Sequence, residues 1–439
     1  MREVGSAALP RRMQLRYGFN EIDAWWHVSL GPHSEEIRRQ MRRMSTSVVR
    51  LFVFDKPVPD PVTEWRLFVA YVDAILDVGA VPMITFAKFH QPIDAPRNLD
   101  TFIARCCDVV WGCLEQWGGD RVRDWLWCIW NEPNNKPVGE GLTYEQYAQI
   151  YLRTSSAIIG LLEPHLDGRR AMIGGPALDG FQPYWQDWIV RLLSDVDERL
   201  IGFVSWHHYG DWRPVLPGAE LDVDLLNSPD APEGGAYERL LMAQTPEYEA
   251  RARAVARILG DRNILNVCGE LNSIVHHDHT YVGGLNQNAF GAAYYASALI
   301  HLIRGGADLE MRWVATENDD AYGLICRNGE VTPAGLAKQL FAEHVRFGDW
   351  ISFPSYRPDM PDVDSVVAWT DDGRISGVFV HAAKGELMFD PSDWDDRLGR
   401  CTTQLCIDER TGNTVRSEVL SGRIRFDDYG VIVVTNMVV

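Results

Sequence analysis

Two glutamates in this sequence stand where short apolar segments end, and a pair of such acids can break a glycosidic bond. Glu132 lies in the segment WNEPN (130–134), and Glu270 closes the apolar segment 264–270. Cleavage with retention of configuration needs two carboxyl groups about 5–5.5 Å apart, one to protonate the leaving oxygen and one to attack the anomeric carbon. The sequence therefore predicts Glu132 and Glu270 as the catalytic carboxyl pair of a retaining glycoside hydrolase.

The residue after Glu132 bears on how that acid is presented. Pro133 ends a strand and disfavours helical geometry in the residue before it, so we expect Glu132 to be extended and aimed inward. Two plainer interpretations stay open: WNEPN is a strand-end turn, since Asn and Pro are common turn formers, and Glu270 is a salt-bridge partner.

Catalytic residues need a scaffold that brings the ends of distant strands together. Apolar segments of strand length alternate with longer charged segments of helical periodicity, which is typical of buried parallel strands joined by helices. The eight strand candidates are 15–20, 47–54, 81–89, 125–131, 171–176, 202–209, 264–270 and 309–316. Eight such units predict an α/β fold, a closed (β/α)8 TIM barrel, whose active site lies at the carboxyl ends of the strands.

The helical periodicity recurs between these segments. The helix candidates are 34–44, 64–78, 99–117, 143–162, 182–195, 246–259, 287–304 and 333–347. No GxGxxG follows the first strand, which weakens a dinucleotide-binding fold as the alternative. Strand candidates four and seven carry Glu132 and Glu270, and strands so spaced face each other across a barrel mouth.

Two regions depart from the alternating pattern. The segment 214–245 is rich in Pro, Gly and acidic residues, and we expect it to be an insertion over the barrel mouth. After 348 the chain changes to short alternating segments separated by turns, which predicts a smaller β-sandwich-like domain. The expected organisation is a catalytic barrel at 15–348 and a β-rich accessory domain at 349–439, with residues 1–14 as a possible partner strand.

Composition excludes several classes of partner. The chain has 439 residues and a net charge of −19, which would repel nucleic acid and anionic lipid surfaces. No uncharged apolar window of about 18 residues is present, and the N-terminus lacks the apolar region of an export signal. The eight cysteines show no zinc-ligand spacing and suit reduced thiols, so we expect a cytoplasmic protein without cofactor or metal.

At several positions the chain resembles glycoside hydrolase clan A, and within it family 39, which includes β-xylosidases and α-L-iduronidases. The resemblance is carried by WNEPN (130–134), GGP (174–176), SWHHY (205–209), Glu270 followed by Leu-Asn-Ser, the loop at 278–280 and Trp313. It implies the same fold, with Glu132 as the acid/base and Glu270 as the nucleophile, and an oligosaccharide or glycoside as substrate.

The resemblance also implies roles for residues around the acids. Asn131 would bind the sugar 2-hydroxyl, and Trp313 would form the floor of the subsite where cleavage occurs. Arg50, His207 and Tyr209 match positions that support the nucleophile or the sugar. Arg50 can also hold Glu270 ionised on physical grounds, because an opposite charge nearby lowers the pKa of a carboxyl group.

Other positions differ from the family pattern. Members usually have a His soon after the strand-two Arg and a Trp after the nucleophile, whereas this chain has Phe52 and Leu271. Lys88 and His90 lie near the mouth at the end of the third strand. Lys88 could contact an acidic sugar or stay solvated on the surface.

Three other functions compete with an exo-acting, β-xylosidase-like glycosidase. They are an endo-acting polysaccharide hydrolase, a non-catalytic carbohydrate-binding barrel and a metal-dependent barrel hydrolase. The metal alternative would use histidines at 207–208 and 276–279, but adjacent residues on a strand point to opposite faces, so His207 and His208 cannot share one ion. The residues leave the sugar and its anomeric configuration open.

Overall fold

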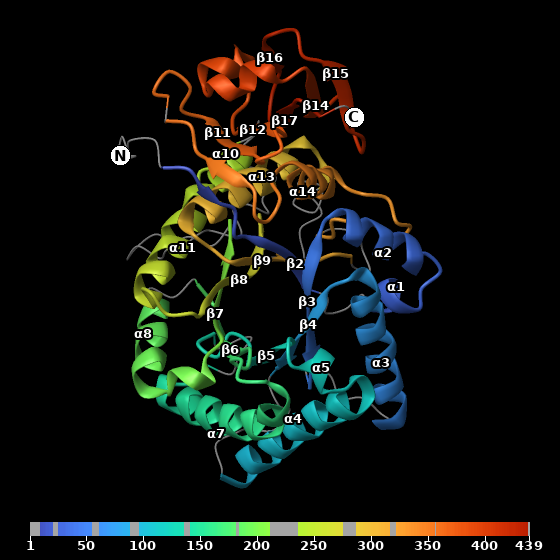
Figure 1. The fold of residues 1–439 in the computed structure, drawn as a ribbon, viewed down its shortest axis with the longest axis vertical. Helices are drawn as coiled ribbons and strands as arrows, with labels where there is room; N and C mark the ends of the chain where they lie inside the picture. Colours follow the sequence, from blue (N-terminus) through green and yellow to red (C-terminus); the bar gives the residue numbers. More distant parts are fainter. Residues whose placement is uncertain are drawn as a thin grey trace.

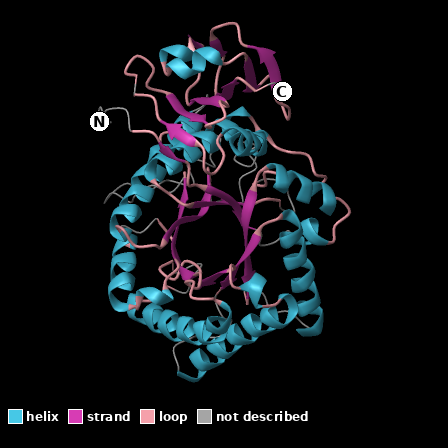
Figure 2. Ribbon diagram, in the orientation of Figure 1, coloured by secondary structure: helices cyan, strands magenta, loops and turns pink. Residues whose placement is uncertain are grey.

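A computed structural model describes residues 9–20, 25–54, 61–87, 96–135, 141–180, 184–210, 236–274, 287–316, 322–355 and 357–437. Within them the chain forms a closed barrel of eight parallel strands inside a ring of helices, with a second, strand-rich unit packed on one side (Figures 1 and 2). Among the described residues, no helix combines the length and apolar character needed to cross a membrane. None of the eight cysteines forms a disulfide.

The barrel strands follow the predicted order, each paired in parallel with the next and the last with the first. They are β2 (Arg16–Asn20), β3 (Thr46–Val53), β4 (Val81–Phe86), β5 (Leu126–Ile129), β6 (Ile173–Leu178), β7 (Phe203–Tyr209), β8 (Leu265–Asn272) and β9 (Leu309–Trp313). Nearly all of their residues are buried, because the strands have helices on one side and the barrel interior on the other. The predicted (β/α)8 barrel is confirmed.

Helices connect the strands and cover the outside of the barrel. They are α1 (Trp25–Ser29), α2 (Ser34–Arg43), α3 (Pro61–Val78), α4 (Pro96–Trp117), α5 (Gly119–Val122), α7 (Tyr144–Leu162), α8 (Trp185–Asp195), α10 (Ala236–Met242), α11 (Thr245–Leu259), α13 (Ala289–Gly305) and α14 (Pro333–His344). Helix α7, which follows the WNEPN loop, begins with a capping box: Thr143 accepts from the Gln146 N–H, and the Gln146 side chain accepts from the Thr143 N–H.

The strand-rich unit contains a seven-stranded antiparallel sheet in the order β1, β10, β11, β12, β17, β14, β15. Its strands are β1 (Arg11–Arg12), β10 (Trp350–Ser352), β11 (Val363–Trp369), β12 (Ile375–His381), β17 (Gly430–Thr435), β14 (Thr403–Ile407) and β15 (Arg416–Val419). A separate pair, β13 (Leu387–Phe389) and β16 (Ile424–Phe426), lies beside it. The predicted C-terminal β domain is present, whereas its exact bounds stay a prediction.

Successive side chains of the central strands point to opposite faces of this sheet, and both faces are buried. Val378 and Val380 belong to the hydrophobic core that continues into the barrel. Phe379, between them, belongs to a second core with Phe389 and Phe426 of the two-stranded sheet. One face of the sheet therefore packs on the barrel and the other on its own small core.

The insertion predicted at 214–245 lies largely outside the described residues. Its last part is described and contains α10. The histidine-containing loop at 276–279 also lies outside the described residues.

Candidate active site

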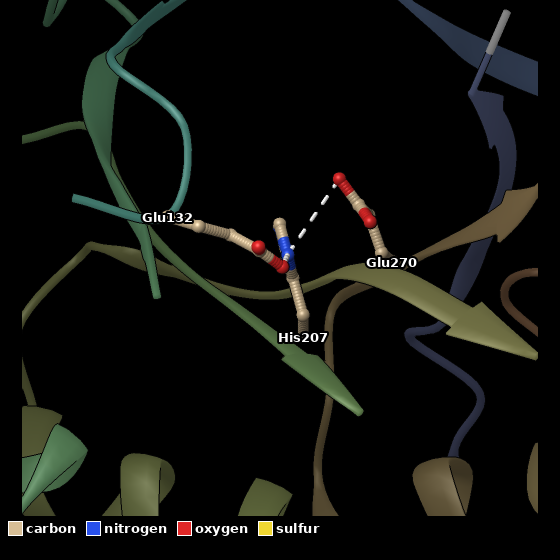
Figure 3. Close-up of side chains that lie close together, drawn as sticks. All are labelled: Glu132, His207 and Glu270. Atoms are coloured by element: carbon tan, nitrogen blue, oxygen red, sulfur yellow. Dashed lines mark hydrogen bonds and ion pairs between the residues drawn. The ribbon is translucent and has the colours of Figure 1, made fainter. Parts of the chain in front are cut away.

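The two predicted catalytic glutamates meet at the carboxyl end of the barrel, where β5, β7 and β8 present side chains to a common space (Figure 3). Nδ1 of His207 lies 2.7 Å from Oε1 of Glu132 and 3.6 Å from Oε1 of Glu270. One oxygen of each glutamate and one nitrogen of His207 all lie within 4.8 Å of one another. Strand ends far apart in the sequence thus bring two carboxyl groups close enough to contact the same bond of a substrate.

Glu270 receives one donor on each oxygen. Arg50 on β3 donates through Nη1 to Oε1 at 2.8 Å, and the hydroxyl of Tyr209 on β7 donates to Oε2 at 2.7 Å. All three side chains are almost completely buried. These two hydrogen bonds fix the orientation of the carboxylate and stabilise its negative charge.

Arg50 connects Glu270 to other polar side chains of the site. Its Nη1 also lies 3.2 Å from Oδ1 of Asn20, and its Nε donates to Oγ1 of Thr85 at 2.9 Å. Its Nη2 donates to Oδ1 of Asn131 at 2.7 Å, so the position of the Asn131 amide is set by the same guanidinium. Burial and four acceptors hold this cation in one place.

The backbone at Glu132 differs from the prediction. Its φ is +44°, in the left-handed region, rather than extended as expected from the following Pro133. Trp130, just beyond the end of β5, also has a positive φ, +74°. A hydrogen bond from the Glu132 N–H to the Ala177 carbonyl, 2.8 Å long, ties this turn to β6 and outweighs the local preference. The acid does reach the site, but through a tight left-handed turn.

Two asparagines that follow Glu132 support its position, and the sequence analysis assigned neither a role. The amide of Asn134 donates to the Asp179 carbonyl at 2.9 Å and accepts from the Asp179 N–H at 3.1 Å. Nδ2 of Asn135 donates to Oε2 of Glu132 at 3.2 Å. The sequence signal for this role is the preference of Asn for local hydrogen bonds in turns.

A glycine before Glu270 makes room for the histidine between the acids. A Cβ at Gly269 would lie 2.2 Å from Oγ of Ser205 and 3.2 Å from Nε2 of His207. A larger residue at 269 would therefore displace the Ser205 hydroxyl and crowd the His207 ring. The sequence analysis did not single out this glycine.

Burial shifts the pKa values of the three central groups. It raises the pKa of Glu132 to about 7, and the hydrogen bond from Asn135 opposes this only in part. Burial also raises the pKa of Glu270, although Arg50 acts in the opposite direction. The expectation that Arg50 favours the ionised Glu270 holds for its direct effect, but the net shift is upward. Burial lowers the pKa of His207 to about 3, which keeps this ring neutral.

The same three residues, Glu132, His207 and Glu270, have a spacing at which a metal ion could be held. Arg50 lies against this group and already binds Glu270, and a fixed guanidinium at 2.8 Å repels a cation at that carboxylate. His208 points away from the site, with its ring 4.7 Å from that of Tyr248 on α11. The contacts of the group are those of an acid pair rather than of a metal centre.

Aromatic side chains flank the acids at β3 and β9. Trp313 ends β9 and is half-buried, and the ring of Phe52 meets it edge-on at a centroid distance of 6.5 Å. The Arg50 guanidinium lies 4.4 Å from the Phe52 ring centroid. Phe52 therefore supports Arg50 on one side and Trp313 on the other.

The remaining predicted site residues, Lys88 and His90, lie outside the described residues. Of the nine predicted residues, the structure brings six into one connected cluster through hydrogen bonds and ion pairs: Glu132, Glu270, Arg50, Asn131, His207 and Tyr209. Trp313 joins them through its contact with Phe52.

Comparison with known proteins agrees with this geometry. Residues 70–216 match the family described as Glycosyl hydrolases family 39. A Beta-xylosidase of Geobacillus stearothermophilus is 33% identical over 159 residues, which are 35% of this chain and 30% of that protein. The aligned part is thus about a third of that relative's length.

Two solved structures share the fold over nearly the whole chain. The GH39 enzyme from Xanthomonas axonopodis pv. citri has a TM-score of 0.63 at 15% identity and covers 98% of this chain and 95% of its own. A monomeric beta-xylosidase from Caulobacter crescentus CB15 has a TM-score of 0.62 at 15% identity and covers 98% and 97%. The resemblance predicted from the motifs is confirmed: the chain is similar to the glycosyl hydrolases of family 39.

Proposed function

We propose that this protein is a retaining glycoside hydrolase in which Glu132 is the acid/base and Glu270 the nucleophile. The observation that carries the proposal is the spacing of the two carboxyl groups, which have oxygens within 4.8 Å of each other. Retaining enzymes hold these groups about 5–5.5 Å apart, whereas inverting enzymes need about 6.5–9.5 Å to admit a water. The short separation favours direct attack on the anomeric carbon.

In the first step Glu132 gives its proton to the glycosidic oxygen, the bond from that oxygen to the anomeric carbon breaks, and a Glu270 oxygen bonds to this carbon. In the second step Glu132 takes a proton from water, the water oxygen bonds to the anomeric carbon, and the ester to Glu270 breaks. Both glutamates end in their starting states. The leaving group departs as an alcohol and the sugar as a hemiacetal, with a net consumption of one water.

The environment of each acid suits its role. A pKa of about 7 keeps a large share of Glu132 protonated near neutral pH, as a proton donor requires. Arg50 and Tyr209 stabilise the charge on Glu270 before attack. When Glu270 becomes a neutral ester, a nearby negative charge disappears, and Glu132 can then release its proton and act as a base.

We infer an exo-acting glycosidase with β-xylosidase-like specificity. Support comes from the Beta-xylosidase relative, from the family match at 70–216, which includes Glu132, and from the solved beta-xylosidase that shares the fold. An endo-acting polysaccharide hydrolase would use the same two acids. A panel of 4-nitrophenyl glycosides and a separate digestion of xylo-oligosaccharides distinguish the two, because release of single sugars from chain ends identifies exo action.

The proposal is tested by replacing each acid. Glu270→Gln should reduce hydrolysis by at least about 10⁴-fold, since it removes the nucleophile. Glu132→Ala should lose activity that added azide restores, with a glycosyl azide of retained configuration as product. Glu115→Gln, on the exposed face of α4, is the matched control and should keep wild-type activity.

Unchanged hydrolysis by the Glu270→Gln variant would remove this mechanism and leave the barrel as a binding scaffold or another enzyme. Dialysis of the wild type against EDTA should leave the rate unaltered. A loss that zinc or manganese restores would instead favour metal-dependent hydrolysis at Glu132, His207 and Glu270.

A further inference from the structure

The carboxyl group of Glu132 is held at both oxygens, and the two partners differ in kind. Oε1 faces Nδ1 of His207 at 2.7 Å, on the side where Glu270 lies. Oε2 faces away from that pair and accepts a hydrogen bond from Nδ2 of Asn135 at 3.2 Å. The family resemblance and the proposed mechanism leave Asn135 without a role.

Asn135 is itself fixed by the backbone of the loop. Its N–H donates to the Glu132 carbonyl at 2.8 Å, and its own carbonyl accepts from the Gly141 N–H at 3.3 Å. The adjacent Asn134 binds both backbone groups of Asp179, which follows β6. The side-chain amide of Asn135 is therefore held in place. Its hydrogen bond restricts the rotation of the Glu132 carboxyl group about the Cγ–Cδ bond.

The chemistry of the two partners distinguishes the two oxygens. An amide N–H can donate but cannot accept, so the oxygen that it contacts must offer a lone pair. A neutral imidazole nitrogen can accept a proton or donate one, and burial keeps His207 neutral. A protonated Glu132 is therefore best accommodated with its proton on Oε1 and with Oε2 as the carbonyl oxygen.

We propose that Asn135 is a positioning residue that, by donating to Oε2 of Glu132, places the transferable proton on Oε1, the oxygen that faces the cleavage site. The inference rests on the proposed function, because it concerns the orientation of the same acid/base. The hydrogen bond also stabilises the ionised form of Glu132, so it opposes the rise in pKa that burial causes.

The test replaces the donor while keeping its shape. Asn135→Asp is isosteric but cannot donate when ionised, and its charge opposes ionisation of Glu132. Asn135→Ala removes the contact altogether. Both changes should raise the pKa of Glu132 and move the alkaline limb of kcat/KM to higher pH, by about 0.5–1 unit for Ala and more for Asp.

Substrates with different leaving groups separate positioning from a general loss of structure. The dinitrophenolate of a 2,4-dinitrophenyl glycoside departs without being protonated. The alkoxide of an alkyl glycoside must be protonated as it leaves. In Asn135→Ala, kcat/KM for the alkyl glycoside should fall about 10–100-fold, and that for the dinitrophenyl glycoside by less than about threefold. Equal losses on both substrates would mean that Asn135 only supports the loop.

A readout without substrate keeps this inference separate from the proposed function. Carboxyl-¹³C glutamate labelling allows Glu132 to be titrated by NMR, with its signal assigned by its loss in Glu132→Gln. Glu115→Gln is the control, because Glu115 lies on the exposed face of α4, outside the hydrogen-bond network of the acid. It should leave the Glu132 pKa within about 0.3 unit of the wild type.

The outcomes are decisive in either direction. An upward shift in Asn135→Asp and Asn135→Ala, and none in Glu115→Gln, supports the inference even if no glycoside is hydrolysed. An unchanged Glu132 pKa in Asn135→Ala overturns it even if the protein proves to be a glycosidase. Should Asn135→Asp fail to fold by circular dichroism, the alanine variant alone decides.

Discussion

Glu132 and Glu270 are chemically identical residues that their surroundings make different. Glu270 accepts from Arg50 and Tyr209, a cation and a hydroxyl. Glu132 has a neutral imidazole on one oxygen and an amide on the other. Since an adjacent cation favours ionisation more than neutral donors do, we expect Glu270 to be the ionised and Glu132 the protonated member of the pair, as the proposed mechanism requires.

This difference predicts a bell-shaped pH dependence of kcat/KM. Activity should fall above pH about 7, where Glu132 loses the proton that it must donate. It should also fall at acid pH, where Glu270 gains a proton, and because burial raises the pKa of Glu270 this limb should lie above the ordinary glutamate value of about 4.3. Stopped assays across pH 4–9 with an alkyl glycoside measure both limbs. A rate that stays constant from pH 6 to 9 would contradict the assignment of Glu132.

At the scale of elements, the barrel is joined to its outer helices by a buried ion pair. Nζ of Lys338 on α14 lies 2.5 Å from Oε1 of Glu310 on β9, and both side chains are fully buried. The same Nζ donates to the Gly18 carbonyl on β2 at 2.8 Å and to the Tyr295 hydroxyl on α13 at 3.0 Å. Burial lowers the pKa of Lys338 to about 8. Contacts of this one ammonium group therefore link α14 to β9, β2 and α13.

Removing one member of this pair should destabilise the fold. Lys338→Met leaves Glu310 buried without its cation and should reduce the free energy of unfolding by about 3–5 kcal/mol. The double variant Lys338→Met/Glu310→Gln should recover a part of that loss, because no unpaired charge remains. Urea unfolding followed by circular dichroism measures both. A double variant less stable than the sum of the single changes would contradict this account.

At the scale of the whole molecule, the barrel and the β-rich unit share one hydrophobic core and several polar contacts, among them a buried cluster around His301. His301 on α13 lies 3.0 Å from Glu249 on α11 and 3.3 Å from Asp364 on β11, with Arg304 also near Glu249. Asp364 also accepts from Ser297 at 2.6 Å. Burial lowers the pKa of His301, but Asp364 and Glu249 outweigh it, so that its pKa is raised overall.

The two units should consequently unfold together. We expect a single calorimetric transition for the wild type. Because the pKa of folded His301 is raised, its contribution is complete below the unfolded value of about 6.5 and is lost as pH rises through the folded pKa. Asp364→Asn should lower stability at pH 6 by about 1–3 kcal/mol and reduce the loss of stability between pH 6 and 9. Two separate transitions in the wild type would show that the β-rich unit folds alone.

Several features were predictable because they depend on local sequence. Alternating apolar and amphipathic segments predicted eight strands and the helices between them, since buried parallel strands need apolar residues on both faces. The WNEPN segment and the strand-end Glu270 predicted the acid pair, because a closed barrel brings all strand ends to one rim.

Other features exist only in the folded chain. Pro133 predicted an extended Glu132, but its hydrogen bond to Ala177 comes from a neighbouring strand and imposes a positive φ. The rise in the pKa of Glu132 results from burial among elements distant in sequence, and the role of Asn135 depends on where this turn directs the carboxyl group. The sequence alone determined which residues could react and which strands carry them. Only the tertiary structure decided their protonation and orientation, because desolvation and hydrogen bonding depend on neighbours that local sequence does not specify.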